Sequence, residues 1–141
     1  MTCELALEKA KKNGLSHRIQ CSPVDVLNST KWLNEQESSV LMSHFISFFN
    51  PDEIKKIYTT AKQYIKNNDK LFIWDTMSND NETGNMTASR LSMYFLNTAT
   101  GRGMAYPASE HINILESVGY TIDKIYDVEA IEHKFIVASV K

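Results

Sequence analysis

Two short apolar runs on either side of a marked helix start constrain the fold of this chain most. The runs are SVLMSHF at residues 39–45 and LFIWDTM at residues 71–77, both typical of buried strands. Between them, Asn50-Pro51-Asp52-Glu53 combines a capping residue, a first-turn proline and two acids that suit the positive end of a helix. Apolar residues then recur at helical spacing to about residue 66. Strand, helix and strand in this order predict two parallel strands of an α/β sheet.

The rest of the chain adds helices and strands around this unit. We expect helices at residues 4–13, 85–101 and 107–120, and strands at residues 18–26, 121–128 and 134–141. Pro23 ends the first of these strands, and the short connection between the last two favours an antiparallel hairpin. The predicted fold class is therefore α/β: a mainly parallel sheet with a C-terminal antiparallel hairpin, flanked by helices. We expect a single domain over residues 1–141.

The overall composition excludes several classes of function. The formal net charge is −2, which gives no general attraction to nucleic acid or to an anionic membrane. No apolar run reaches the roughly 18 residues that a membrane-spanning helix needs, and the first residues lack the apolar segment of a secretory signal. Cys3 and Cys21 have neither CxxC spacing nor a nearby pair of histidines, so we expect no disulfide framework, no metal site and a cytoplasmic location.

Polar side chains stand where the predicted strands end. Ser43 and His44 close the run at residues 39–45, Asp75 closes the run at residues 71–77, and Asp25 closes the strand that Pro23 interrupts. In open α/β sheets, ligands bind outside the carboxyl ends of the strands, so these residues predict a binding site there. Each also has a structural reading. An aspartate can cap a turn, a serine can bond to the backbone, and a lone histidine is more often structural than catalytic.

Longer phrases of the sequence resemble a known family. They are ALEKAKKNGLSHRIQCSPVDVL, VLMSHFISFFNPDEIKKIYTTAKQYIKNNDKLFIWDT, SRLSMYFLNTATGRGMAYPASEHINILESVGY and HKFIVASVK. In order and spacing they resemble the C-terminal part of class I S-adenosylmethionine-dependent O-methyltransferases that act on small molecules. The resemblance runs from about residue 5 to residue 141. It implies a partial Rossmann-like methyltransferase sheet, S-adenosylmethionine as cofactor, and methyl transfer to a hydroxyl of a small aromatic acceptor.

The sequence departs from the family at its beginning. The family's domain opens with a strand, a glycine-rich G-x-G loop and a second strand, whereas the only G-x-G here, Gly101-Arg102-Gly103, follows a predicted helix. The family's helical dimerisation domain is also missing. The chain therefore resembles the C-terminal portion of a larger enzyme, with a possible homodimer formed through a region absent here. The alternative is an inactive remnant, or a subunit that completes a methyltransferase only with a missing N-terminal half. A different nucleotide-binding module would need a phosphate loop, which none of the five glycines supplies.

By the same resemblance, three residues are candidates for cofactor binding. Asp25 would bond the adenine amino group, Val26 would pack on the adenine ring, and Ser43 would line the cofactor.

Three further residues are candidates for catalysis. Ser47 stands where plant-type members carry a histidine that acts as general base, and serine is not basic enough to replace it. His44 could take this role if the end of the strand turns it toward the pocket. Asp75 stands where the family places an acid beside that histidine. Without a base, proximity and orientation could still carry methyl transfer.

The acceptor pocket would be lined by Met93, Tyr94 and Met104, although core packing is the commoner fate of such side chains. Arg102 could pair with a carboxylate of the acceptor or cap the preceding helix. His111 is expected to face solvent. His133 would reach the ligand edge only if the turn of the hairpin lies there.

Overall fold

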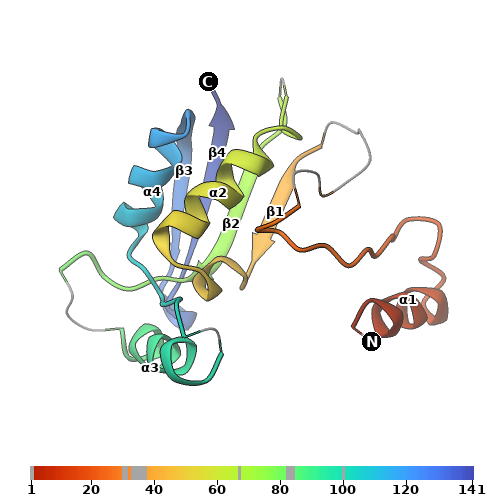
Figure 1. The fold of residues 1–141 in the computed structure, drawn as a ribbon, viewed down its shortest axis with the longest axis horizontal. Coiled ribbons are helices and arrows are strands. Elements are labelled where there is room, and N and C mark those ends of the chain that lie inside the picture. The colour runs from red at the N-terminus through yellow and green to blue at the C-terminus, as the bar shows by residue number, and fades with distance from the viewer. Residues whose placement is uncertain (1, 30–31, 33–37, 67, 82–84, 100) are drawn as a thin grey trace. The chain divides into compact units, whose positions relative to one another are not determined.

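The computed structural model describes residues 2–29, 32, 38–66, 68–81, 85–99 and 101–141. The chain divides into two compact units, Met1–Trp32 and Leu33–Lys141, and each is considered by itself (Figure 1).

The described residues of the first unit form the helix α1 (Thr2–Lys12), close to the predicted residues 4–13. The helix ends at Gly14, whose φ of 69° is the left-handed conformation that favours glycine at a helix end. The predicted strand at residues 18–26 is wrong, because these residues form turns and extended backbone without a strand partner. A strand needs a neighbour to receive its backbone hydrogen bonds, and the sequence pattern alone did not reveal that the described residues of this unit supply none.

The second unit is built on a four-stranded sheet. Its strands are β1 (Val40–Ser43), β2 (Leu71–Thr76), β3 (Tyr120–Val128) and β4 (His133–Val140), in the order β1-β2-β4-β3. The predicted parallel pair, β1 with β2, and the predicted antiparallel hairpin, β3 with β4, are both confirmed. The α/β fold class is confirmed as well. Antiparallel pairing has a larger share than expected, because β4 also pairs with β2 and so lies inside the sheet.

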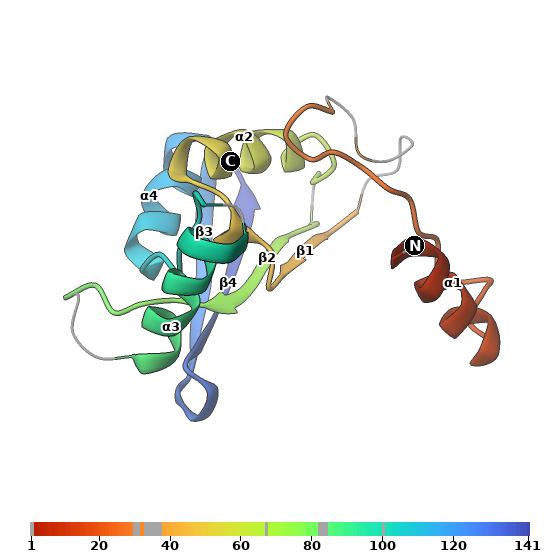
Figure 2. The same ribbon diagram turned by 60° about the horizontal axis from the view of Figure 1, so that its bottom comes forward.

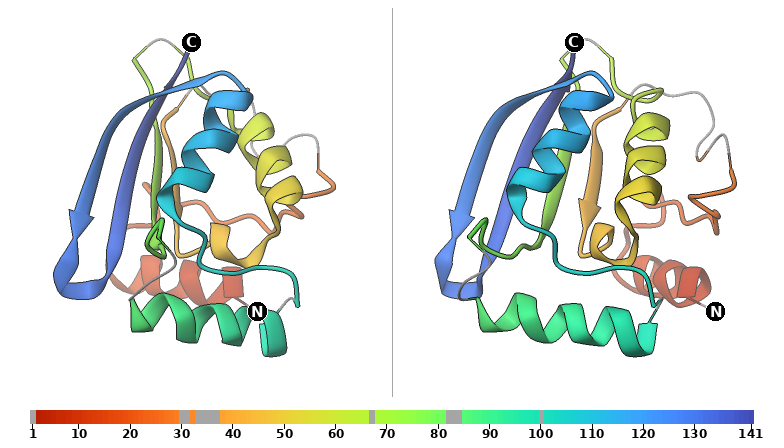
Figure 3. Two further views of the ribbon diagram at one scale, coloured as in Figure 1. Left: turned by 90° about the vertical axis from the view of Figure 1, so that its left-hand side faces the viewer. Right: turned by 60° about the vertical axis from the view of Figure 1, so that its left-hand side comes forward.

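Two helices cover one face of this sheet. They are α2 (Pro51–Ala61) and α4 (Ala108–Ser117), which lie side by side in both views of Figure 3. The start of α2 is the predicted one: Asn50 accepts a hydrogen bond from the Glu53 amide, and the Glu53 carboxylate accepts one from the Asn50 amide. The core between helices and sheet consists of fully buried aliphatic side chains, among them Ile54, Ile57, Ile73, Leu115 and Ile136.

A third helix lies at the carboxyl ends of β1 and β2. This helix, α3 (Met86–Tyr94), continues into a π-helical turn, η2 (Phe95–Ala99), and Figure 2 brings it to the front. Asn85 caps α3 by accepting from the Ala88 amide, and its own amide donates to the Met77 carbonyl at 2.7 Å. The cap therefore ties α3 to the chain that leaves β2.

The opposite face of the sheet is apolar. An open groove on it is lined by Phe72, Trp74, Tyr126, Val128, Phe135 and Val137. Within the described parts of the chain, no helix is both long and apolar enough to cross a membrane.

Candidate functional site

The carboxyl edge of the sheet gathers several of the predicted side chains. Ser43 is the last residue of β1 and is exposed. His44 follows it with a φ of 47°, an uncommon conformation for a residue other than glycine. Its amide donates to the Trp74 carbonyl at 2.8 Å, which continues the β1–β2 ladder by one residue. The imidazole of His44 is exposed, so it is available to a ligand at this edge.

Ser47 and Asp75 lie together but are buried. Ser47 belongs to a short 3-10 helix, η1 (Ile46–Phe48), and its amide donates to Asp75 Oδ2 at 3.4 Å. The exposed fractions of the two residues are 2% and 3%. Burial raises the pKa of the Asp75 carboxyl, while hydrogen bonds from Ser47 and Thr76 and the charge of His44 oppose this effect. The Ser47 hydroxyl is near the carboxylate, yet its oxygen finds no partner in good hydrogen-bond geometry among the described residues.

Gly103, the second glycine of the G-x-G segment, has a packing role. A Cβ on Gly103 would lie 2.1 Å from the Ser47 carbonyl oxygen and 2.4 Å from the Phe48 carbonyl carbon. Gly103 thus allows the segment after α3 to press against η1 and to close over Ser47. Its neighbour Arg102 forms an ion pair with Glu53 at 2.7 Å, so its side chain is bound to the start of α2.

The turn of the β3–β4 hairpin lies at this same edge, as the right-hand view of Figure 3 shows. His133, the first residue of β4, stands opposite Thr76, the last residue of β2. Its Nε2 lies 3.3 Å from Thr76 Oγ1, and its ring centroid lies 4.9 Å from that of His44. The condition under which His133 reaches the ligand edge is therefore met. Sequence reasoning did not select it, because the register of β4 against β2 is set by distant residues.

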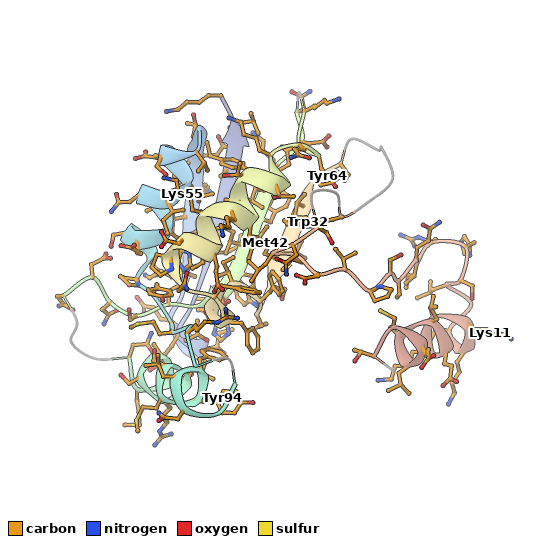
Figure 4. The ribbon with its side chains drawn as sticks, in the orientation of Figure 1. Lys11, Trp32, Met42, Lys55, Tyr64 and Tyr94 are labelled. Atoms are coloured by element: carbon orange, nitrogen blue, oxygen red, sulfur yellow. The ribbon has the colours of Figure 1, made fainter. Side chains whose placement is uncertain are left out.

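The three candidates for acceptor binding have different surroundings. Met104 lines a pocket with residues that follow β2 and with α3: Ser78, Asn79, Asp80, Ala88, Ser89, Ser92, Ala105 and Pro107. Met93 and Tyr94 are 67% and 53% exposed on α3, where Figure 4 labels Tyr94. Core packing therefore does not explain Met93 or Tyr94.

Asp25 and Val26 belong to the first unit. The Asp25 carboxylate caps the turn at residues 26–28: Oδ1 accepts from the Leu27 and Asn28 amides, and Oδ2 accepts from the Asn28 side chain at 2.7 Å. These bonds lower the pKa of Asp25 and keep it a hydrogen-bond acceptor at neutral pH. The Val26 carbonyl accepts from the Trp32 indole at 3.3 Å.

His111 corrects a prediction, because it is fully buried rather than solvated. It lies three and four residues before the buried Ile114 and Leu115, on the face of α4 that packs inward. This spacing was visible in the sequence and could have identified the residue as part of the core.

Comparison with known proteins gives the fold a family context. No protein-family model matches the chain. The L-tyrosine C(3)-methyltransferase of Streptomyces lavendulae is 26% identical over 119 residues, which are 84% of this chain and 32% of that protein. Among solved structures, the mitomycin 7-O-methyltransferase MmcR has a TM-score of 0.84 at 16% identity. The complex of PigF with SAH has a TM-score of 0.83 at 18% identity.

Each of these two structures is matched over 99% of this chain, which spans 39% of MmcR and 40% of PigF. The chain thus has about two-fifths of the length of these structures and about a third of that of the curated relative. The resemblance is confirmed at the level of the fold: this chain has the fold of the C-terminal part of a class I S-adenosylmethionine-dependent O-methyltransferase.

Proposed function

We propose that the chain takes part in S-adenosylmethionine-dependent methyl transfer to a hydroxyl of a small aromatic acceptor, as the C-terminal portion of a methyltransferase catalytic domain. One observation carries the proposal: on a methyltransferase fold, Ser43, His44 and the buried Asp75 lie together at the carboxyl edge of the parallel strands. This is the edge at which α/β sheets bind their ligands. A cytoplasmic location and a homodimer formed through a region outside this chain complete the proposal.

The residues present fit part of the cofactor. Asp25 retains an acceptor oxygen for an adenine amino group, because Oδ2 receives one hydrogen bond from the described residues. Val26 offers an apolar side chain to the adenine ring, and Ser43 an exposed hydroxyl at the end of β1. A glycine-rich loop is missing from this set, since Gly103 is packed against η1. S-adenosylmethionine, when bound, supplies an electrophilic methyl group on a sulfonium.

His44 is proposed to accept the proton of the acceptor hydroxyl. It is exposed, whereas Ser47 and Asp75 are buried, and the Gly103 segment packs against Ser47. Asp75 interacts electrostatically with His44. Ser47 acts in this proposal through its amide, which holds the Asp75 carboxylate.

The pocket that Met104 lines is proposed to hold the aromatic ring of the acceptor, and the exposed Met93 and Tyr94 of α3 are proposed to contact the acceptor as well. Methionine and aromatic side chains together suit a flat ring. MmcR is named for an O-methylation and the Streptomyces lavendulae protein for a C-methylation of tyrosine. Removal of a phenolic proton makes both the oxygen and the adjacent ring carbon nucleophilic, so a base serves either product. We favour the oxygen as the methylated atom.

Titration of S-adenosylhomocysteine into the purified 141-residue chain tests the cofactor assignment, with circular dichroism as proof of folding. Micromolar heat-detected binding supports the proposal, and a folded chain without binding contradicts it for the chain alone. The His44 role is tested with a phenolic acceptor and labelled cofactor. His44→Ala is expected to lower methylation about 10²-fold, the low end of what general bases contribute. Unchanged methylation would remove His44 from the mechanism.

A second candidate is a subunit that becomes a methyltransferase only with a missing N-terminal half. Two observations favour it. The apolar groove on the second sheet face, which includes Trp74 and Phe135, is open. The other is that β1 is the end strand of the sheet and exposes 63% of Leu41. Parallel strands are ordinarily covered on both faces, so a partner portion would have apolar surface to bury here.

The dye anilinonaphthalene sulfonate distinguishes this candidate from the first. A folded chain that binds the dye, loses that binding in Trp74→Ser and does not bind S-adenosylhomocysteine fits a subunit. A chain that binds S-adenosylhomocysteine alone, and whose sheet face does not bind the dye, is inconsistent with it. Leu5→Ser, an exposed leucine of the first unit, controls for dye binding elsewhere.

A further inference from the structure

The geometry points to His133 as a positioning residue for His44. This inference deepens the proposed function and rests on it, since it takes His44 as the group that accepts the proton of the acceptor.

The ring of His133 is fixed by hydrogen bonds at both nitrogens. Nδ1 bonds to the Ile131 carbonyl, and Nε2 lies 3.3 Å from Thr76 Oγ1. A carbonyl can only accept, so Nδ1 carries a proton, and in the neutral tautomer Nε2 accepts from the Thr76 hydroxyl. Thr76 is itself buried at the end of β2. The imidazole of His133 is therefore anchored to the end of β2 and to the turn of the β3–β4 hairpin, and its basic nitrogen is occupied.

The ring of His44 is held in a different way. Among the described residues its imidazole forms no hydrogen bond, but it meets two ring faces nearly at right angles. The His133 centroid lies at 4.9 Å with an interplanar angle of 72°, and the Trp74 centroid at 6.4 Å with an angle of 87°. The ring centroids of Trp74 and His133 lie 5.1 Å apart, so these two rings also contact each other. The two rings form a wall that limits the rotamers of His44 while leaving both of its nitrogens for a ligand.

The backbone adds a second constraint. The φ of 47° at His44 sets the direction of its Cα–Cβ bond away from that of a regular strand residue. Uncommon backbone conformations of this kind persist where surrounding structure holds them, and they concentrate at functional sites. Here the hydrogen bond from the His44 amide to the Trp74 carbonyl holds it. Trp74 thus fixes the backbone of His44, and His133 limits its side chain.

In this arrangement the two histidines have different roles. A general base needs a free nitrogen and a ring held within a fraction of an ångström of its working position. His44 has the free nitrogens, and His133 provides the fixed surface. A shift of about 1 Å in a reacting group can cost 10²-fold in rate, so loss of the wall is expected to reduce turnover without removing the base.

Three variants test the wall. His133→Ala removes the ring, His133→Phe keeps a ring of similar shape without its hydrogen bonds, and Thr76→Val removes the anchor of the ring. His17→Ala, a histidine of the first unit, is the matched control. With a phenolic acceptor, His133→Ala is expected to lower kcat 10- to 100-fold with little change in KM. His133→Phe should recover most of the lost kcat, and Thr76→Val should have a kcat between those of His133→Ala and His133→Phe. His17→Ala should have the kcat of the wild type.

The ring signals of His44 in two-dimensional NMR give a readout that does not depend on turnover. In the wild-type chain we expect nuclear Overhauser contacts between the two histidine rings and a single set of His44 signals. In His133→Ala we expect the His44 signals to move toward rotamer-averaged positions, while the core methyl signals stay in place. Unchanged His44 signals in a folded His133→Ala chain would overturn the inference.

The inference and the proposed function fail in distinguishable ways. If His44→Ala keeps full activity, the proposed role of His44 is wrong. If His44→Ala loses activity and His133→Ala keeps it, only the positioning role of His133 is overturned.

Discussion

The hydroxyl of Tyr58 on α2 and Nδ1 of His111 on α4 lie 2.9 Å apart and share a hydrogen bond inside the core. Neither side chain is exposed, and Nε2 of His111 finds no partner among the described residues. Burial lowers the pKa of His111 to about 4, so the imidazole is neutral in the folded protein at neutral pH. The pair joins the two helices that cover the sheet.

This pair predicts a loss of stability in acid. Above pH 6.5, His111 is neutral in both the folded and the unfolded chain and contributes no pH dependence. As the pH falls from 6.5 to 4, the unfolded chain binds the proton and the folded chain does not, so the free energy of unfolding falls. The full loss is about 3 kcal/mol. Urea unfolding at several pH values between 7 and 4 measures it.

Substitution of the histidine separates this effect from other acid-sensitive groups. His111→Phe is expected to cost about 1–3 kcal/mol at pH 7, because the Tyr58 hydroxyl loses its partner in the core. The same variant should then lose less stability than the wild type on acidification. His17→Ala, on the first unit, should keep the wild-type slope. An equal slope in His111→Phe and the wild type would refute the assignment.

Asp75 predicts a change of stability with pH that has the opposite sign to that of His111. Its pKa is raised by burial, so the stability linked to this group is fully present below its ordinary value of 3.8 and is lost as the pH rises through the folded pKa. Asp75→Asn is therefore expected to raise the melting temperature at pH 7, and the gain should shrink toward pH 3.5. Asp123→Asn is a control with the reverse expectation, because Lys70 and Ser139 lower the pKa of that exposed carboxyl. A lower melting temperature for Asp75→Asn at pH 7 would contradict the account.

The close packing at Gly103 predicts that a side chain at this position destabilises the fold. Its Cβ would come within 2.1 Å of the Ser47 carbonyl oxygen, so Gly103→Ala must push the segment after α3 away from η1. We expect a loss of about 1–3 kcal/mol, as for overpacked cores, measured by denaturant unfolding. Gly101→Ala is the matched control. Its nearest contact would be an ordinary 3.7 Å, and only its φ of 70° would be strained, for roughly 1 kcal/mol. Equal losses in the two variants would argue against the close approach.

Asp25 predicts an effect on ligand binding that can be separated from its turn. Asp25→Ala should weaken S-adenosylhomocysteine binding about 10-fold, as expected for one hydrogen bond to a charged group. Asn28→Ala removes the side-chain donor from the same turn and keeps the carboxylate, so it should change the affinity much less. Calorimetric titration of both variants gives the comparison, and unchanged affinity in Asp25→Ala would leave its carboxylate with the capping role alone.

Sequence patterns predicted correctly those helices and strands that are determined by residues close together in the sequence. Asn50 and Glu53 form the expected capping box, and the predicted parallel pair of strands and the final hairpin are both present. The expected strand before Val26 failed because a strand depends on a neighbour, which no local pattern reports. The place of β4 between β2 and β3 is a distant pairing of the same kind.

The sequence could predict those residues of the candidate site that lie at the end of an individual strand. Ser43, His44 and Asp75 follow directly from where the two apolar runs stop. The contact of His44 with His133 depends on residues 89 positions apart in the numbering and on the register of β4, so it needed the structure. The packing around Ser47 likewise involves Gly103, which the sequence showed only as part of a G-x-G segment after a predicted helix.

The interior place of β4 also governs when this sheet can exist during synthesis. Residues 133–140 supply the neighbour of both β2 and β3, so each of these strands emerges from the ribosome with the backbone edge that β4 will pair still unpaired. Until β4 emerges, the described strands of this chain can offer one another only the pairing of β1 with β2, and a two-stranded ribbon is marginally stable in water. The pairings of β2 and β3 with β4 therefore form only after residues 133–140 have emerged, and until then their unpaired edges are open to chaperones and to aggregation.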